Sequence, residues 1–290
     1  MNRIAPGRTF IGIATGYTGR QTFGLHAVST ERMREHAEAC RDLLQGRPIK
    51  HVWKAAEREI RFRHRPGAYL DTEHEIPIYA GADGPKALQV AGQAGDGLVV
   101  TLKYAHAMGN SPEVFAQQLA TARQAAADAG RTFDGAYTMW STVPCVLEPG
   151  ESAASPRMLE RVGAAAMMAY HTYACDPAMG EYLPPPIRDR LEIYEREVMA
   201  RFDVPRELAY QEAHAGHLSH LLDGEAAVLT EDIVRMTTLT GTAQEIEAVL
   251  RRLEEEGLRN VSFWFPPHLT REGVLEIEEH LMPLLRGAPA

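Results

Sequence analysis

The sequence predicts an α/β protein built on a parallel sheet, and two observations support this prediction. Short apolar runs rich in β-branched residues alternate along the chain with longer segments of helical period. The runs are continuously apolar, which is typical of strands that helices cover on both faces. Strand-then-helix units in series give right-handed crossovers, so the candidate folds are an open doubly wound sheet and a (β/α)₈ barrel.

The first predicted strand covers residues 9–14, a continuous apolar run that stops before Gly16 and predicts burial on both faces. The first predicted helix covers residues 31–44, which have helical composition and an apolar stripe. Ser29 is a suitable N-cap for this helix, and Gly46 follows its end.

A polar segment rich in Arg and His follows at 47–75, and its alternation at 59–63 predicts an excursion or hairpin. Gly84 and Pro85 precede the next helix and place proline in its first turn. In chain order, the remaining predicted strands are 76–80, 97–102, 137–147 and 260–265, and the remaining predicted helices are 86–95, 111–129, 242–256 and 270–286.

The region 151–228 is too long for a simple connection, and we expect a helical elaboration over one end of the fold. Its predicted helices are 156–174, 186–201 and 206–222, interrupted by the prolines at 184–186. Five strand-helix units are visible, whereas a barrel needs eight. Either the sheet is open, or three units are missing before Met1.

Composition and charge exclude several classes of protein. With 290 residues and 45% hydrophobic content, the chain forms one large domain or two small ones. A net charge of −9 argues against nucleic acid and anionic membranes as partners. Three cysteines without a C-x-x-C pair support neither a disulfide framework nor a zinc knuckle. A start without a signal-peptide pattern, and the lack of a long apolar run, predict a cytoplasmic protein without a membrane span.

Several motifs resemble the bacterial luciferase-like oxidoreductases. Residues 3–16, with Phe23-Gly24-Leu25 and 43–46, resemble the fourth strand of that family and the helix after it. Residues 76–88, with Ala91-Gly92 and Gly95-Asp96-Gly97, resemble its fifth strand, phosphate loop and sixth strand. Residues 239–242 and 256–258 resemble its final unit.

This resemblance implies a (β/α)₈ TIM barrel that binds FMN or the deazaflavin coenzyme F420, in the branch similar to methylenetetrahydromethanopterin reductase. It implies one partial barrel domain over 1–290 without the family's first three units, which usually supply a cis peptide under the ring and part of the substrate pocket. Members are commonly dimers or larger, so we expect a homo-oligomer, a dimer in the simplest case, that acts on a small-molecule substrate.

In such folds ligands bind at the carboxyl ends of the strands. Thr15 and Gly16 follow the first strand, and Thr15 resembles the family's hydroxyl that contacts the cofactor; the alternative is a loop threonine that caps its own turn. Thr101 and Lys103 end the third strand. Lys103 is a candidate partner for the phosphate or an acidic substrate, with a solvated surface lysine as the alternative.

The second strand leads into the sequence Gly81-Ala82-Asp83-Gly84 at a helix N-terminus, where free N–H groups and the helix dipole favour a phosphate. Asp83 departs from the small neutral residue that the family favours, and a carboxylate there repels a phosphate unless it turns away. The alternative is a simple strand-to-helix turn with an aspartate cap.

Candidate substrate-pocket residues are Tyr17, His171, His214 and His217. Tyr17 stands where many deazaflavin enzymes carry an acid, which puts that acid's proton-donor role in doubt. His171 could belong to a lid or to an aromatic patch between helices. On a helix, His214, His217 and His220 would spread over about 120°. No carboxylate or cysteine completes a convincing ligand set with them, so no metal is predicted.

The sequence therefore predicts an oxidoreductase that transfers a hydride between F420 and a small organic substrate, with no catalytic residue assigned. One alternative is an FMN-dependent two-component monooxygenase. A second is a truncated, catalytically silent remnant that binds a flavin or is only structural, and a third is a metal enzyme built on the histidine triplet. Motifs of serine hydrolases and P-loop nucleotide triphosphatases are absent.

Overall fold

The computed structural model describes residues 2–53, 55–65, 67, 71–101, 103–104, 107–108, 111–133 and 135–287. The chain divides into two compact units, each assembled from separated stretches of sequence. The first unit comprises Met1–Gly16, Val28–Val99 and Gln117–Met139, and the second comprises Tyr17–Ala27, Val100–Ala116 and Trp140–Ala290. The prediction of a single domain over 1–290 stays a prediction.

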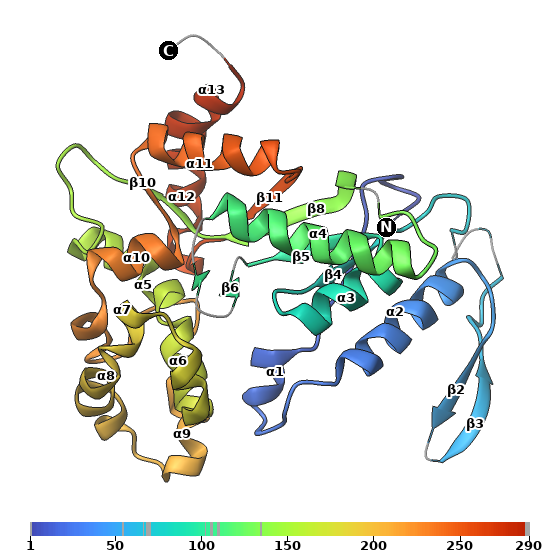
Figure 1. Cartoon of the computed structure of the whole chain (residues 1–290), viewed down its shortest axis with the longest axis horizontal. Helices are drawn as coiled ribbons and strands as arrows, with labels where there is room; N and C mark the ends of the chain where they lie inside the picture. Colours follow the sequence, from blue (N-terminus) through green and yellow to red (C-terminus); the bar gives the residue numbers. More distant parts are fainter. Residues whose placement is uncertain are drawn as a thin grey trace. The chain divides into compact units, whose positions relative to one another are not determined.

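The first unit is built on parallel strands, as predicted (Figure 1). Strand β4 (Ile78–Gly81) pairs in parallel with β1 (Ile11–Ile13) on one side and β5 (Gly97–Val100) on the other. Within this unit the strand order is β1-β4-β5. The prediction that β1 is buried on both faces was wrong, since Gly12 is exposed and its neighbours Ile11 and Ile13 are half-buried. The physical reason is that β1 is the last strand in this order and β4 is its one neighbour among the described strands.

Three long helices accompany these strands at the predicted places. They are α2 (Thr30–Leu44), α3 (Pro85–Ala94) and α4 (Pro112–Asp128). The Ser29 hydroxyl accepts a hydrogen bond from the Arg32 N–H at 3.2 Å, which confirms the predicted cap of α2. A Cβ on Gly92 would lie 2.0 Å from the Ala122 carbonyl oxygen, so only glycine allows α3 and α4 to pack this closely.

Asp96, in the turn between α3 and β5, ties the elements of the first unit together. Its Oδ1 accepts from Arg41 at 2.7 Å and from Arg131 at 3.1 Å, and its Oδ2 accepts from the Ile78 N–H at 3.0 Å. Arg41 lies on α2, and Ile78 begins β4. The Asp-Gly motif at the start of β5 therefore has a structural role.

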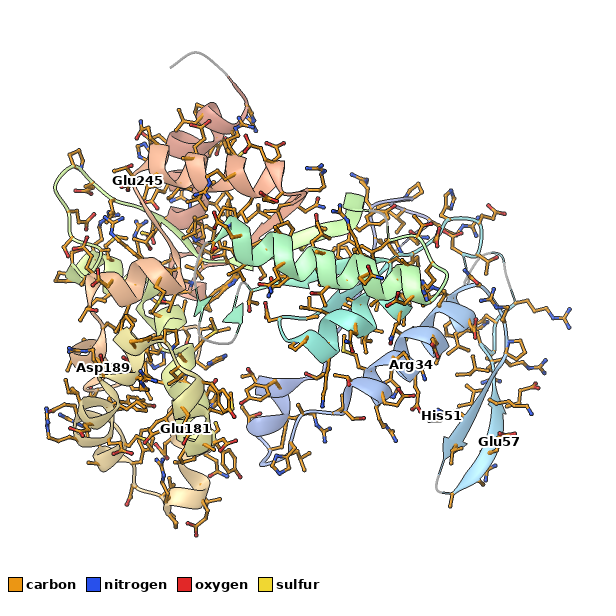
Figure 2. All side chains as sticks on the ribbon, in the orientation of Figure 1. Arg34, His51, Glu57, Glu181, Asp189 and Glu245 are labelled. Carbon is orange, nitrogen blue, oxygen red and sulfur yellow. The ribbon has the colours of Figure 1, made fainter. Side chains whose placement is uncertain are left out.

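The predicted hairpin is also present in the first unit. Strands β2 (Ile49–Trp53) and β3 (Ala56–Ile60) pair antiparallel, with Ala55 in a left-handed conformation at the turn. Every residue of β3 is exposed, and Figure 2 shows the Glu57 side chain on this hairpin. The predicted alternation over 59–63 thus marks a solvent-exposed strand that ends at Ile60.

In the second unit, the predicted strand over 137–147 is two strands. Strand β8 (Thr138–Thr142) is followed by β9 (Pro144–Val146), which pairs in parallel with β10 (Leu239–Gly241). Strand β11 (Asn260–Phe263) follows β8 in the sheet order, and the Trp264 N–H donates to the Thr142 carbonyl. The break at Val143 changes the pairing partner, which an apolar run alone does not reveal.

The last predicted helices of the second unit are confirmed. Helix α11 (Ala243–Glu255) begins with a capping box between Thr242 and Glu245. The C-terminal helix consists of α12 (Thr270–Glu276), a π-helical turn η7 (Ile277–Leu281) and α13 (Met282–Leu285). The short elements α1 (Tyr17–Gln21), β6 (Lys103–Tyr104), β7 (Ala107–Met108), η1 (Gly135–Tyr137) and η6 (Pro267–Leu269) complete the strands and helices outside the elaboration. No described helix combines the length and apolarity needed to cross a bilayer.

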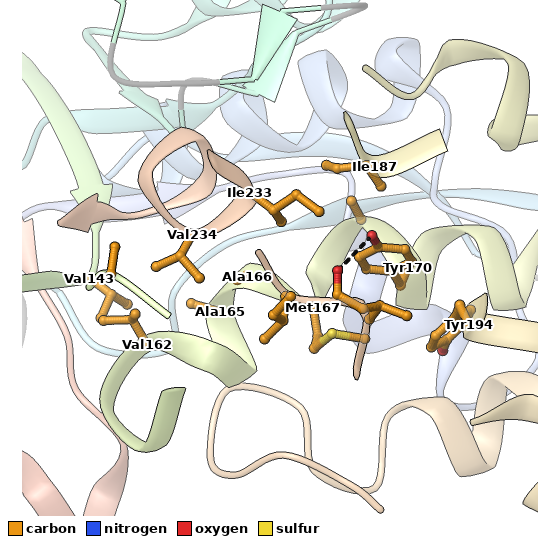
Figure 3. Close-up of a cluster of buried hydrophobic side chains, with 14 of the residues drawn as sticks. Val143, Val162, Ala165, Ala166, Met167, Tyr170, Ile187, Tyr194, Ile233 and Val234 are labelled. Atoms are coloured by element: carbon orange, nitrogen blue, oxygen red, sulfur yellow. Dashed lines mark hydrogen bonds between the residues drawn. The ribbon is translucent and has the colours of Figure 1, made fainter. Parts of the chain in front are cut away.

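The elaboration over 151–228 is helical, as predicted, and it encloses an apolar core (Figure 3). Tyr170 packs on Tyr194 with ring centroids 5.1 Å apart, and Figure 3 shows Ile187 and Ile233 in the same cluster. Its elements, together with the α10 that follows, are α5 (Pro156–Ala166), α6 (Met168–Cys175), η2 (Pro177–Tyr182), α7 (Pro185–Arg188), α8 (Leu191–Glu197), η3 (Met199–Arg201), η4 (Arg206–Leu208), α9 (Ala209–Ala213), η5 (Glu225–Val228) and α10 (Glu231–Thr237).

The predicted helix over 206–222 was wrong beyond Ala213. Residues 214–219 form consecutive turns, and Leu218 adopts a left-handed conformation with φ 58°. A Cβ on Gly216 would lie 2.4 Å from the His220 carbonyl oxygen. The chain turns back on itself here, so helical spacing does not describe its histidines. Helix α10 and strand β10 were not predicted.

Candidate functional site

The loops after β1 and β4 meet at one edge of the first unit. Gly16, three residues after the end of β1, has a positive φ of 70°, and the Thr15 carbonyl accepts from the Val28 N–H at 3.0 Å. A Cβ on Gly81 would lie 3.1 Å from the Ala14 Cβ, so the two loops are in contact. Parallel pairing thus brings the predicted Thr15 and Gly81 regions to the same edge.

Helix α3 begins at this edge without a side-chain cap. Its N-cap is Gly84, with φ −90° and ψ 157°, and Pro85 starts the first turn. A Cβ on Gly84 would meet nothing within 4 Å among the described residues, so the loop is open on that side. Backbone N–H groups of a helix's first turn lack partners within the helix. This terminus therefore presents N–H groups and the positive end of the dipole to an anion.

Asp83 does not occupy the cap position, because Gly84 does. The Gln118 amide nitrogen donates to the Asp83 carbonyl at 3.1 Å and to its carboxylate at 3.5 Å. Ala82, which precedes Asp83, donates its N–H to the Val99 carbonyl at 3.0 Å and is itself buried. The loop is thereby fixed to both α4 and β5.

Gln118 is a site residue that sequence reasoning missed. Its side chain is buried, and its Oε1 atom has no hydrogen-bond partner among the described residues. A buried polar atom without a partner points to an absent ligand or water. The signal in the sequence was an amide on the apolar face of α4, three residues after Phe115 and beside Leu119, both of which are buried.

The remaining predicted residues lie in the second unit. Thr101 is exposed and directly follows β5. Lys103 begins β6, and its side chain lies outside the described part of the structure. Tyr17 begins α1 and is 40% exposed. Their predicted roles in binding cofactor or substrate stay predictions.

Three of the four predicted pocket residues do come together within the second unit. The ring centroids of His171, His214 and His217 are 4.9 to 5.5 Å apart, and the Nδ1 atoms of His171 and His217 are separated by 3.2 Å. His171 is buried on α6, whereas His214 and His217 are half-buried in the turns after α9. His220 is exposed and contacts Ser219 instead.

Glu225 belongs to this cluster and was also missed. It is fully buried, and its Oε1 lies 3.0 Å from His171 Nε2 while its Oε2 accepts from the Leu222 N–H at 2.7 Å. On the other side, His214 Nδ1 lies 2.8 Å from the Tyr210 carbonyl. Burial lowers the pKa of His214, and the hydrogen bond to Tyr210 opposes that effect.

The neighbours of the cluster separate it from the aromatic core. Tyr170 faces the core and lies 3.5 Å from the Val228 carbonyl, whereas Tyr173 donates to Glu195 at the surface. Cys175 lies 3.8 Å from His214 Nδ1, and burial raises the pKa of its thiol to about 11. His171 is thus directed to the other histidines, and the aromatic patch forms around its neighbours.

Comparison with known proteins identifies relatives. The family model described as luciferase-like monooxygenase matches residues 1–260. The 5,10-methylenetetrahydromethanopterin reductase of Archaeoglobus fulgidus is 34% identical over 111 residues, which are 36% of this chain and 30% of that protein. The F420-dependent glucose-6-phosphate dehydrogenase of Kineococcus radiotolerans is 34% identical over 104 residues, 34% of this chain and 29% of that protein. These matches cover about a third of each curated relative.

Solved structures share the fold. The F420-dependent tetrahydromethanopterin reductase of Methanopyrus kandleri aligns with a TM-score of 0.55 at 16% identity, over 96% of this chain and 74% of that one. An F420-dependent secondary alcohol dehydrogenase in complex with an F420-acetone adduct aligns with a TM-score of 0.53 at 16% identity, over 90% of this chain and 65% of that one. The oxygenating constituent of 3,6-diketocamphane monooxygenase from Pseudomonas putida, in complex with FMN, aligns with a TM-score of 0.54 at 13% identity. The alignment covers 97% of this chain and 73% of that one.

Proposed function

Since the chain belongs to the luciferase-like monooxygenase family, whose model matches residues 1–260, we propose that it is an oxidoreductase that binds coenzyme F420 and exchanges a hydride with a small organic substrate. Its fold, with a central parallel sheet, aligns with the fold of that family's barrel enzymes. The relatives named for F420 act as dehydrogenases, which favours hydride transfer as the reaction class.

The observation that carries the proposal is the start of α3 at the carboxyl edge of β4. An N-terminus capped by glycine, next to an open position at Gly84, suits a phosphate group of the cofactor. The partnerless oxygen of Gln118 suits a hydroxyl donor on the same ligand. Both features belong to the first unit and fit a phosphorylated flavin or deazaflavin.

The chain's own residues would bind and position the cofactor. Gly81 and Gly84 let the backbone approach the phosphate, and the first-turn N–H groups of α3 hold its charge. Thr15, half-buried at the adjoining loop, offers a hydroxyl to the same edge. When bound, the cofactor supplies the hydride chemistry, and the protein supplies orientation and exclusion of water.

FMN is the second candidate cofactor, because the FMN-bound monooxygenase matches the fold as well as the F420 enzymes do. A deazaflavin lacks the N5 nitrogen and disfavours oxygen activation, so the two cofactors predict different reactions. The other alternative is a catalytically silent remnant that binds a flavin without turnover or is only structural. The homodimer and the cytoplasmic location stay predictions, and native mass spectrometry measures the first of them.

The test is a fluorescence titration of the full chain with F420 and, separately, with FMN. We expect saturable binding of F420 in preference to FMN. We expect Gly84→Asp to weaken that binding at least about tenfold, because a carboxylate would face the phosphate. The circular dichroism spectrum should be retained, since the backbone at Gly84 suits any L residue and a side chain has space there.

Gly84→Asn is the matched control, with the same size and no charge. Preference for FMN would replace F420 with FMN in the proposal. Equal binding by the two Gly84 variants would contradict the phosphate site at α3. Failure of the native chain to bind either cofactor would favour the silent remnant.

A further inference from the structure

We propose that His171, His214 and His217 form a zinc-binding site in the second unit, with the fourth coordination position left to water or an anion. Imidazole nitrogens are common zinc ligands, and a set of three protein ligands with one open position is an established arrangement for that ion. The proposed flavin site involves the start of α3 in the first unit, so the zinc site does not rest on it.

The spacing of the ring nitrogens fits a tetrahedral ion. The Nδ1 atoms of His171 and His217 are 3.2 Å apart. Ligands at zinc–nitrogen distances of about 2.0–2.1 Å in a tetrahedron are separated by about 3.3–3.4 Å. One ligand atom from each of the three histidines lies within 4.8 Å of the others. The third imidazole therefore needs only a small ring movement to reach the same ion.

Hydrogen bonds already select the ligating tautomer of two rings. A carboxylate only accepts hydrogen bonds, so the Glu225 contact places the proton of His171 on Nε2 and leaves a lone pair on Nδ1. The Tyr210 carbonyl likewise places the proton of His214 on Nδ1 and leaves a lone pair on Nε2. Such acceptors behind ligating histidines orient the ring and raise its basicity at metal sites.

The backbone holds two of the ligands in one tight turn. The His217 N–H donates to the His214 carbonyl at 3.1 Å. Gly216 lies too close to the His220 carbonyl for any side chain, and Leu218 adopts a left-handed conformation that L residues rarely take. This turn directs His214 and His217 toward His171 on α6.

The sequence pattern suggested a different triplet. His220 completes the i, i+3, i+6 spacing, but it is exposed and contacts Ser219. His171, 46 residues before His217 in sequence, takes its place, and Glu225 orients the His171 ring from outside the ligand set. The expectation of no metal rested on the lack of a carboxylate or cysteine to complete a ligand set. In the observed cluster a third histidine, His171, completes a set of three nitrogen ligands instead.

The experiment uses the full chain without a histidine tag, stripped of metal and titrated with Zn²⁺ in competition with a chromogenic chelator. We expect one zinc per chain by elemental analysis. His217→Gln, at a half-buried position, should weaken binding at least about fivefold, and Glu225→Gln should weaken it by about 10–100-fold. His220→Gln is the matched control and should bind like the native chain.

A second readout is the visible spectrum of the Co²⁺-loaded chain. Ligand-field bands of a tetrahedral ion should appear in the native chain and in His220→Gln, and should be lost in His217→Gln. Circular dichroism checks that each variant is folded. Less than one zinc per two native chains, or affinities of His217→Gln and His220→Gln that agree within about fivefold, would overturn the proposal.

Discussion

Asp96 in the first unit and Glu225 in the second are carboxylates held by several donors, yet the donors differ in kind. Asp96 accepts from Arg41 and Arg131, whose guanidinium groups can only donate hydrogen bonds. Glu225 accepts from a backbone N–H and from His171, an imidazole that can change its tautomer. The first arrangement fixes a fold, whereas the second can respond to what binds beside it.

The largest expected effect tests the arginine side of this comparison. Asp96→Ala removes the carboxylate that pairs with both guanidinium groups, which keep only backbone carbonyls as acceptors, and it removes the acceptor of the Ile78 N–H. We expect a loss of about 3 kcal/mol in the free energy of unfolding. Urea unfolding followed by circular dichroism measures it. The control is Asp42→Ala, which removes an exposed pair with Arg47 and should cost less than about 1 kcal/mol. Equal losses would show that Asp96 does not tie the first unit together.

The next effect compares the two carboxylates directly by amide substitution. Asp96→Asn should cost about 2 kcal/mol, because its amide N–H groups cannot pair with arginine. Glu225→Gln should cost less than about 1 kcal/mol, because His171 can move its proton to Nδ1 and accept from the new amide. Both values come from the same urea experiment on metal-free protein. A loss in the free energy of unfolding for Glu225→Gln as large as that for Asp96→Asn would mean that the His171 tautomer is fixed.

The smallest effect uses an acid of the second unit that is paired as Asp96 is. The Arg157 guanidinium holds the pKa of Glu151 at about 2, below its ordinary 4.5. A carboxyl whose pKa is lower in the folded state than in the unfolded state stabilises the fold at pH values above its ordinary pKa. This stability is lost as the pH falls toward the folded-state pKa. At neutral pH the free energy of unfolding of the native chain should be about 1 kcal/mol larger than that of Glu151→Gln, after allowance for solvent screening.

The difference between native chain and Glu151→Gln should shrink below about pH 4.5 and vanish near pH 2. Unfolding free energies measured in urea across that range check it, with the variant as its own reference. A gap that stays constant with pH would show that the pairing with Arg157 contributes nothing to stability.

Elements with local signals were predictable from the sequence. Ser29 caps its helix as expected, because a capping hydroxyl acts within three residues of its own position. Pro85 marks the start of α3 for the same local reason. The parallel strands of the first unit followed from their continuous apolar runs, which burial between helices requires.

Elements decided by distant partners were not predictable. Val143 separates two strands only because β9 pairs with β10, almost one hundred residues later. The helix expected over 206–222 has suitable composition, but Gly216 and Leu218 turn the chain back. Local propensity does not contain these contacts.

The same distinction applies to the candidate sites. The rule that ligands bind at the carboxyl ends of parallel strands predicted that Thr15 and Gly81 share an edge. Gln118 and Glu225 were missed because each is defined by a partner 35 or 54 residues away in sequence. Their burial, which makes a polar side chain informative, exists only in the folded chain.

The first unit consists of three separate stretches of sequence, and this affects the order in which its strands are synthesised. Strand β1 pairs with β4, and the unit's last stretch ends at Met139, so the ribosome releases β1 long before its partner exists. At about 5–20 residues per second, the gap between Ile13 and Ile78 lasts about 3–13 s. During that time the apolar β1 strand lacks its β4 partner and is accessible to chaperones. Two stretches of the second unit, 17–27 and 100–116, are made before the first unit can close.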